Sequence, residues 1–147
     1  MVKQLPLQSR LIVAADYEND PNEEPVREKI LRLCDSLAGS GVIIKVNSAL
    51  RMYGYGLIDE IHERDLEVFA DLKYYDIAAT LDADASFLRM FKPSLVTVAC
   101  DAGFPGLKRL RDELPDTEVL GVTVLTSLND SDMERVGRVC VADAVRR

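Results

Sequence analysis

An acid, an amine and a second acid lie close together in the segment DLKYYDI, as Asp71, Lys73 and Asp76. The apolar run before this segment predicts a buried strand, along which side chains alternate between two faces. Asp71 and Lys73 then share one face, while Leu72 takes the other. Such a pair can position a proton and set its acidity. The simpler alternative is a strand end that points its charges into water.

Predicted strands and helices alternate along the chain, and these elements must position the charged residues. Apolar runs predict the strands, and Pro25, the Gly39–Gly41 segment and Pro115 mark where helices begin or end. The predicted strands cover residues 11–15, 42–46, 67–73, 94–99 and 118–124, and the predicted helices cover residues 25–37, 48–64, 78–91 and 106–114, followed by a mostly helical tail at 128–147. Five strand-helix units with short connections predict an α/β fold with a parallel sheet, in one domain spanning residues 1–147.

Charged residues fall at the carboxyl ends of the first three predicted strands. The first strand ends at Asp16, the second carries Lys45 near its end, and the third ends with Asp71 and Lys73. In parallel α/β folds, ligands bind at the carboxyl ends of the strands. A series of negative, positive, negative and positive groups on neighbouring strands therefore indicates a functional site at this edge.

The composition narrows the classes of function. The 147-residue chain has a formal net charge of -7, so it offers no evident basic face to neutralise nucleic-acid phosphates. Its three cysteines, Cys34, Cys100 and Cys140, form no C-x-x-C pair, so neither zinc nor a redox motif is indicated. Residues 1–10 lack the apolar core of a signal peptide, and no apolar run approaches membrane-spanning length. We expect a cytoplasmic protein without nucleic-acid or membrane partners.

Four stretches of the sequence together resemble the orotidine 5'-monophosphate decarboxylase family. They are residues 11–16, Lys45-Val46, the DLKYYDI segment with Thr80, and VTVLTS at residues 122–127. The resemblance implies a (β/α)8 barrel of the TIM type, of which this chain has about five units. It also implies decarboxylation of orotidine monophosphate to uridine monophosphate without a cofactor or a metal. The implied assembly is a homodimer with shared active sites.

The resemblance assigns roles to the charged residues. Lys73 resembles the general acid that protonates the pyrimidine carbanion left when carbon dioxide departs, and its ammonium group stabilises the developing charge. Asp71 resembles the carboxylate that lies against the substrate carboxylate and holds Lys73. Lys45 resembles the lysine that binds the ribose and completes the charge network. Asp16 resembles the acid that binds the ribose from the first strand.

Four further residues match positions in the family's substrate site. Asp76, counted among the catalytic residues, and Thr80 resemble residues that reach across the dimer interface into the partner's site. Ser127 resembles the serine whose hydroxyl recognises the pyrimidine ring. Ile77 follows Asp76 in the family's motif and is expected to contact the substrate.

The chain also departs from the family pattern. Asn47 stands where a glycine is usual, Ala79 replaces an asparagine, and Ala99 stands where a histidine is common. Family members have eight strand-helix units, and we expect a five-unit piece to expose the apolar edges of its first and last strands.

Two other functions compete with the decarboxylase. The first is a metal-dependent relative on the same barrel, such as 3-hexulose-6-phosphate synthase or ketogulonate-phosphate decarboxylase. Those enzymes place a magnesium-binding glutamate where this sequence has Lys45, which would repel the metal. The second is a non-catalytic fragment or assembly partner, for which the five-unit length is the sole support.

Overall fold

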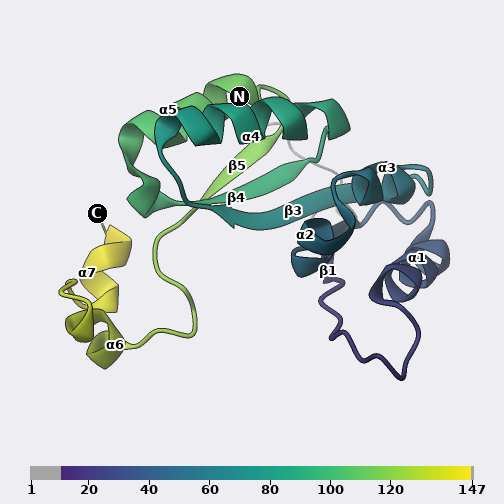
Figure 1. The fold of residues 1–147 in the computed structure, drawn as a ribbon, viewed down its shortest axis with the longest axis horizontal. Coiled ribbons are helices and arrows are strands. Elements are labelled where there is room, and N and C mark those ends of the chain that lie inside the picture. Colours follow the sequence, from purple (N-terminus) through teal and green to yellow (C-terminus); the bar gives the residue numbers. More distant parts are fainter. Residues whose placement is uncertain (1–10, 147) are drawn as a thin grey trace.

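Five parallel strands form the sheet in the computed structural model, which describes residues 11–146. They are β1 (Ile12–Ala14), β2 (Ile43–Val46), β3 (Glu67–Tyr74), β4 (Leu95–Ala99) and β5 (Glu118–Val122). Each strand pairs with the next one along the chain, so the spatial order is β1-β2-β3-β4-β5 (Figure 1). All five carboxyl ends therefore meet at one edge of the sheet, and β1 and β5 are the outer strands.

The helices lie between successive strands, except for the last two, which follow β5. They are α1 (Val26–Leu37), α2 (Ser48–Tyr53), α3 (Gly56–His62), α4 (Ala78–Leu88), α5 (Gly103–Glu113), α6 (Asp130–Arg135) and α7 (Val141–Arg146), with short 3-10 helices η2 (Arg89–Phe91) and η3 (Cys100–Ala102). In Figure 1, α4 and α5 lie side by side along one face of the sheet, and α6 and α7 lie beyond β5. Within residues 11–146, no helix is long and apolar enough to cross a membrane.

The main core lies between the sheet and these helices. One residue in two along the central strands faces the helices, and these residues are apolar and buried: Ile44, Val46, Val68, Ala70, Val96 and Val98. Burying each such valine or isoleucine side chain contributes about 1.5–3 kcal/mol of stability. Helices α4 and α5 approach closely at Gly106, where a Cβ atom would lie 2.7 Å from Leu81 Cδ1. A larger residue at position 106 would therefore require the buried Leu81 side chain to move.

All five strands occur where the sequence predicts them, but two helix predictions need correction. The predicted helix at residues 48–64 is two helices, because Gly54 adopts φ 78° and ψ 177°, which no α-helix accommodates. The predicted helix at residues 106–114 begins earlier, at Gly103, directly after η3. The predicted helical tail consists of α6 and α7, joined by a loop.

Candidate active site

The carboxyl ends of β1, β2 and β3 bring four charged side chains into one row. Lys45 Nζ lies 2.6 Å from Asp16 Oδ2 and 3.7 Å from Asp71 Oδ2, and Lys73 Nζ lies 2.7 Å from the same Asp71 oxygen. The parallel register pairs Ala14 with Lys45, and Lys45 with Phe69. Asp16 lies two residues after Ala14, and Asp71 lies two residues after Phe69. Strand alternation therefore places both on the face of the sheet that carries Lys45. We call Asp16, Lys45, Asp71 and Lys73 the charged row.

The charges in the row stabilise one another. Asp71 is only 7% exposed, and burial by itself raises the pKa of its carboxyl. Hydrogen bonds from Lys73 and Thr97, with the nearby charges of Lys73 and Lys45, outweigh burial and hold the pKa below its usual value. The hydrogen bond to Asp16 is the main reason that the pKa of Lys45 is raised, against the opposing effect of burial. Asp71 is therefore a carboxylate, and Lys45 is an ammonium.

An irregularity at the end of β3 sets the position of Lys73. Between Ala70 and Tyr74, β3 advances four residues while β4 advances two, from Val96 to Val98. Lys73 has φ 49°, in the left-handed region that costs a residue with a side chain on the order of 1–2 kcal/mol. Strain of this kind persists only where surrounding contacts hold it, and it concentrates at functional sites.

Contacts from other elements hold this part of β3. Arg51 of α2 donates a hydrogen bond of 2.8 Å to the Leu72 carbonyl. The hydroxyls of Tyr55 and Tyr74 lie 2.6 Å apart, and burial, followed by this hydrogen bond, raises the pKa of Tyr74. The Tyr55 ring also packs edge-on against Phe91, with ring centroids 5.7 Å apart. The backbone around Lys73 is thus tied to the α2–α3 turn.

A hollow of about 290 Å³ opens beside Lys73. Tyr75 and Ala99 line it from the ends of β3 and β4, and residues 122–125 with Leu128 line it from the end of β5 and the following loop. Ligand sites of small molecules are concave and mostly apolar, with a few polar groups that fix orientation. The Lys73 ammonium is placed to act as such a group at the wall of this hollow.

The other residues singled out from the sequence lie apart from the row. Asp76 accepts a hydrogen bond of 2.7 Å from the Ile77 N–H, and Ile77 itself is 71% exposed. Thr80 is half-buried in the first turn of α4, and Ser127 is exposed in the loop after β5. In the part of the chain that the structure describes, no hydrogen bond or ion pair links these four residues to the charged row.

The positions that depart from the family pattern have local explanations. Asn47 has φ -129°, which does not require glycine, and its side chain accepts a hydrogen bond from the Ser48 N–H at the start of α2. Ala99 leaves room at the wall of the hollow beside Lys73. Ala79 is exposed near the start of α4. Sequence reasoning missed Thr97, a buried hydroxyl that contacts Asp71 and the Lys73 backbone; its polarity within the apolar β4 run was the available signal.

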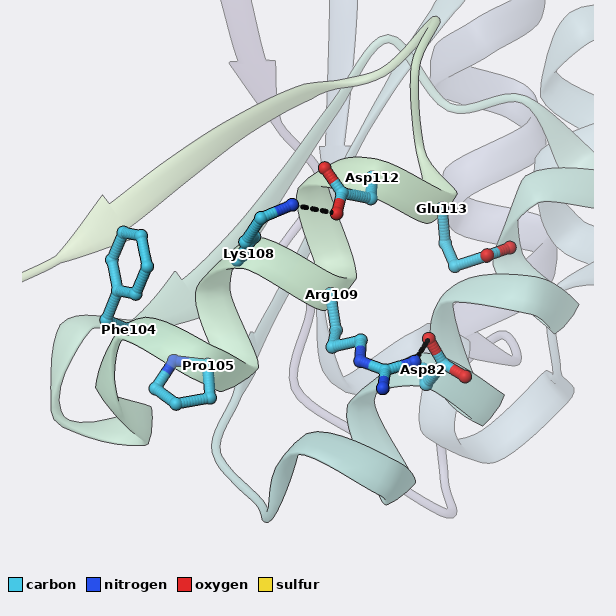
Figure 2. A pocket seen from close by; sticks show the side chains of 7 residues that line it. All are labelled: Asp82, Phe104, Pro105, Lys108, Arg109, Asp112 and Glu113. Atoms are coloured by element: carbon cyan, nitrogen blue, oxygen red, sulfur yellow. Dashed lines mark hydrogen bonds and ion pairs between the residues drawn. The ribbon is translucent and has the colours of Figure 1, made fainter.

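A second hollow, of about 540 Å³, lies on the outer surface of α4 and α5 (Figure 2). Its charged residues are all in exposed ion pairs: Lys108 binds Asp112, Arg109 lies 3.5 Å from Asp82, and Glu113 lies 3.4 Å from Arg89. Figure 2 shows Phe104 at the start of α5, pointing away from these pairs. Because these ion pairs are exposed, as is common on protein surfaces, and none of these charged residues is buried, we do not place the site here.

A parallel sheet whose strands lie side by side in chain order, with helices in the connections and a candidate site at the carboxyl ends, places the protein among the (β/α) barrels. The chain belongs to the orotidine 5'-phosphate decarboxylase / HUMPS family, whose model matches residues 9–146. The structure contains five strand-helix units, so it corresponds to part of such a barrel.

Individual relatives agree with this assignment. An orotidine 5'-phosphate decarboxylase of Pseudomonas putida is 32% identical over 136 residues, which are 88% of this chain and 55% of that protein. The crystal structure of the orotidine 5'-phosphate decarboxylase from Lactobacillus acidophilus matches with a TM-score of 0.77 and 26% identity, over 92% of this chain and 62% of that one. This chain therefore spans about half the length of the curated relatives that it matches.

A further relative was solved with a bound inhibitor. The orotidine 5'-monophosphate decarboxylase from Methanocaldococcus jannaschii, complexed with the inhibitor BMP, matches with a TM-score of 0.65 and 25% identity. The match covers 77% of this chain and 51% of that one.

Proposed function

We propose that this chain carries the charged half of an orotidine 5'-monophosphate decarboxylase active site. The observation that supports this most is the charged row, in which Lys73 stands at the wall of a hollow and is held by the buried carboxylate of Asp71. The substrate class is a pyrimidine nucleotide, and the reaction converts orotidine monophosphate to uridine monophosphate in pyrimidine biosynthesis. The relative solved with BMP supports a ligand of this kind.

In the proposed reaction, the bond between the pyrimidine ring and its carboxylate breaks, and carbon dioxide leaves. The electron pair of that bond stays on the ring carbon, where the ammonium group of Lys73 stabilises it. Lys73 then donates a proton to the same carbon, which completes uridine monophosphate. Because Lys73 supplies both the positive charge and the proton, the proposed step uses no cofactor and no metal.

The remaining members of the row orient the substrate and Lys73. Asp71 faces the substrate carboxylate and, through its hydrogen bond of 2.7 Å, keeps the Lys73 ammonium in place. Lys45 and Asp16, 2.6 Å apart, bind the ribose hydroxyls. Holding the reacting groups in this geometry uses binding free energy to lower the activation barrier of the decarboxylation.

We further propose a cytoplasmic homodimer in which each chain contributes to its partner's site. Asp76, Ile77 and Thr80 follow the row along the chain, and Asp76 and Ile77 are exposed. The exposure of Ile77, at 71%, is compatible with contact with a partner chain. Ser127, in the loop after β5, binds the pyrimidine ring.

The metal-dependent sugar-phosphate reaction is less well supported by the charged row. A magnesium ion would need the oxygens of neighbouring carboxylates. The Lys45 ammonium lies 2.6 Å from Asp16 and 3.7 Å from Asp71, and so already neutralises the two carboxylates of the charged row. The remaining alternative, a fragment without activity, is decided by a turnover measurement.

The test uses two proteins. One is residues 1–147, and the other is the same chain joined to the part of the Pseudomonas putida relative that the match does not cover. We expect the joined protein to convert orotidine monophosphate without added metal and to bind BMP, and residues 1–147 alone to convert it negligibly. A folded joined protein that binds BMP without turnover would contradict the proposal, as would turnover of a hexulose phosphate that requires magnesium.

A further inference from the structure

A closed ring of hydrogen bonds surrounds the end of β3. The Lys73 backbone N–H donates to the Thr97 hydroxyl oxygen at 2.9 Å, and the Thr97 hydroxyl donates to Asp71 Oδ1 at 2.8 Å. The other Asp71 oxygen, Oδ2, accepts from the Lys73 ammonium at 2.7 Å. The ring therefore starts and ends on Lys73, and one hydroxyl on the neighbouring strand closes it.

The irregularity in β3 explains why a hydroxyl is needed there. Regular pairing stops at Ala70 opposite Val96 and resumes at Tyr74 opposite Val98, so Thr97 lies opposite the irregular residues. The Lys73 N–H is thereby removed from the strand ladder, and a buried N–H without a partner costs about 1–3 kcal/mol. The Thr97 hydroxyl accepts this hydrogen bond in place of a backbone carbonyl.

The same hydroxyl gives the two oxygens of the Asp71 carboxylate different partners. Oδ1 accepts from Thr97, which leaves Oδ2 as the oxygen that faces Lys73 and Lys45. Thr97 is 5% exposed and lies within a strand, so its hydroxyl is held in one place rather than exchanged with water. A valine would fill the same volume and suit the strand, but it would leave both Asp71 Oδ1 and the Lys73 N–H without this partner.

We propose that Thr97 is a positioning residue, whose hydroxyl holds both the Asp71 carboxylate and the irregular β3 backbone so that the Lys73 ammonium faces the hollow. This extends the decarboxylase proposal above and depends on it only for the effect on turnover. Thr97 touches no reacting atom in this scheme. Its contribution is to keep the donor already in place before the substrate binds.

The experiment measures residues 1–147 by NMR, so that it needs no activity. Hydrogen exchange of the Lys73 amide reports the first hydrogen bond, and the pH titration of the Asp71 carboxyl carbon reports the second. Thr97→Val removes the hydroxyl, and Thr97→Ser keeps it. Thr117→Val is the matched control, because Thr117 is 4% exposed and its hydroxyl donates to the Pro93 carbonyl instead.

In Thr97→Val we expect the Lys73 amide to exchange about tenfold faster than in the wild type, while the Val96 and Val98 amides keep their rates. We also expect Asp71 to titrate at a higher pH, because it loses a hydrogen bond to its charged form. Thr97→Ser should keep both wild-type values, and Thr117→Val should change neither. If Thr97→Val does not fold, Thr97→Cys, a weaker hydrogen-bonding group of similar size, should shift both readouts in the same directions.

The proposal would be overturned if Thr97→Val, or Thr97→Cys where that variant replaces it, kept the wild-type Lys73 exchange rate and Asp71 titration. It would also be overturned if exchange of all β3 and β4 amides became faster to the same extent. The third contradicting result is that Thr117→Val shifts the Lys73 exchange rate and the Asp71 titration as Thr97→Val does. In the joined protein, Thr97→Val should lower kcat and leave KM nearly unchanged. A joined protein without activity would remove only this kinetic comparison, because the exchange and titration results judge Thr97 independently of the decarboxylase proposal.

Discussion

The two halves of the DLKYYDI segment lie in opposite environments, although only a few residues separate them. In the first half, Asp71 is 7% exposed and each of its oxygens has a partner within the chain. In the second half, Asp76 is exposed and bonded to the next residue's N–H, and Ile77 is 71% exposed. The first half is therefore completed by β1, β2 and β4, whereas the second half presents a charge and an apolar side chain outward.

This difference indicates that the two halves of the DLKYYDI segment have separate roles. A buried charge is stable only when its partners are in place, so the first half must be assembled by the fold itself. An exposed carboxylate beside an exposed isoleucine gains little from its own chain, which is compatible with the proposed contact with a partner chain. The comparison can be tested by changing each half separately.

The largest effect is expected at Lys73. In the joined protein, Lys73→Ala should lower turnover of orotidine monophosphate by at least about a thousand-fold, because it removes a charge that acts in the transition state. Binding of BMP should persist, since ground-state binding depends on other groups as well. Steady-state kinetics and calorimetric binding measure the two quantities.

Lys92→Ala is the matched control for this variant. Lys92 has φ 50°, almost the same left-handed conformation as Lys73 at φ 49°, but it is exposed and precedes β4. It should keep turnover near the wild-type value. Wild-type turnover in Lys73→Ala would show that another group donates the proton.

The next effect concerns the second half of the motif. If Asp76 acts in the partner's site, a mixture of inactive Lys73→Ala and Asp76→Ala joined proteins should recover part of the activity. One mixed dimer then holds a site with both lesions and a site with neither. Activity is measured after subunit exchange has been demonstrated with labelled chains. No recovery after exchange would place Asp76 in its own chain's site.

A smaller effect is expected in the acid stability of residues 1–147. The folded state holds the pKa of Asp71 below its usual value, so the unfolded state binds more protons in this range. The free energy of unfolding should therefore fall as the pH decreases below about 4. Asp71→Asn should flatten this dependence, because it removes the carboxyl whose pKa the folded state lowers. Denaturant titrations at a series of pH values measure the slope.

The smallest effect is a change in one pKa. Burial raises the pKa of Asp84 on α4, and the nearby charge of Asp76 raises it further. Asp76→Asn should lower the pKa of Asp84 by removing that repulsion, while Asp71→Asn should leave it unchanged. NMR titration of the Asp84 carboxyl carbon measures both. An unchanged Asp84 titration in Asp76→Asn would place the two carboxyls farther apart than in this structure.

Much of the fold could be predicted because its signals are local. Each apolar run ends in a turn or a charge, which marks the five strands and places Asp16, Lys45 and Asp71 near their carboxyl ends. Strand alternation also predicted that Asp71 and Lys73 share a face; their side chains do meet, at 2.7 Å, but through an irregular backbone in which Lys73 is left-handed. The break at Gly54 was harder to predict, because a glycine near apolar helical positions is compatible with either a continuous or a divided helix.

The sequence by itself therefore determined the order of the strands, the face on which the charges lie and the family to which the chain belongs. Only the tertiary structure decided how Lys73 is held, since the irregular pairing of β3 and the hydroxyl of Thr97 depend on the register between β3 and β4. Residue types and their spacing along one strand report that strand's two faces. They do not report which atom of a neighbouring strand, 24 or 26 residues away, meets a displaced N–H or a carboxylate.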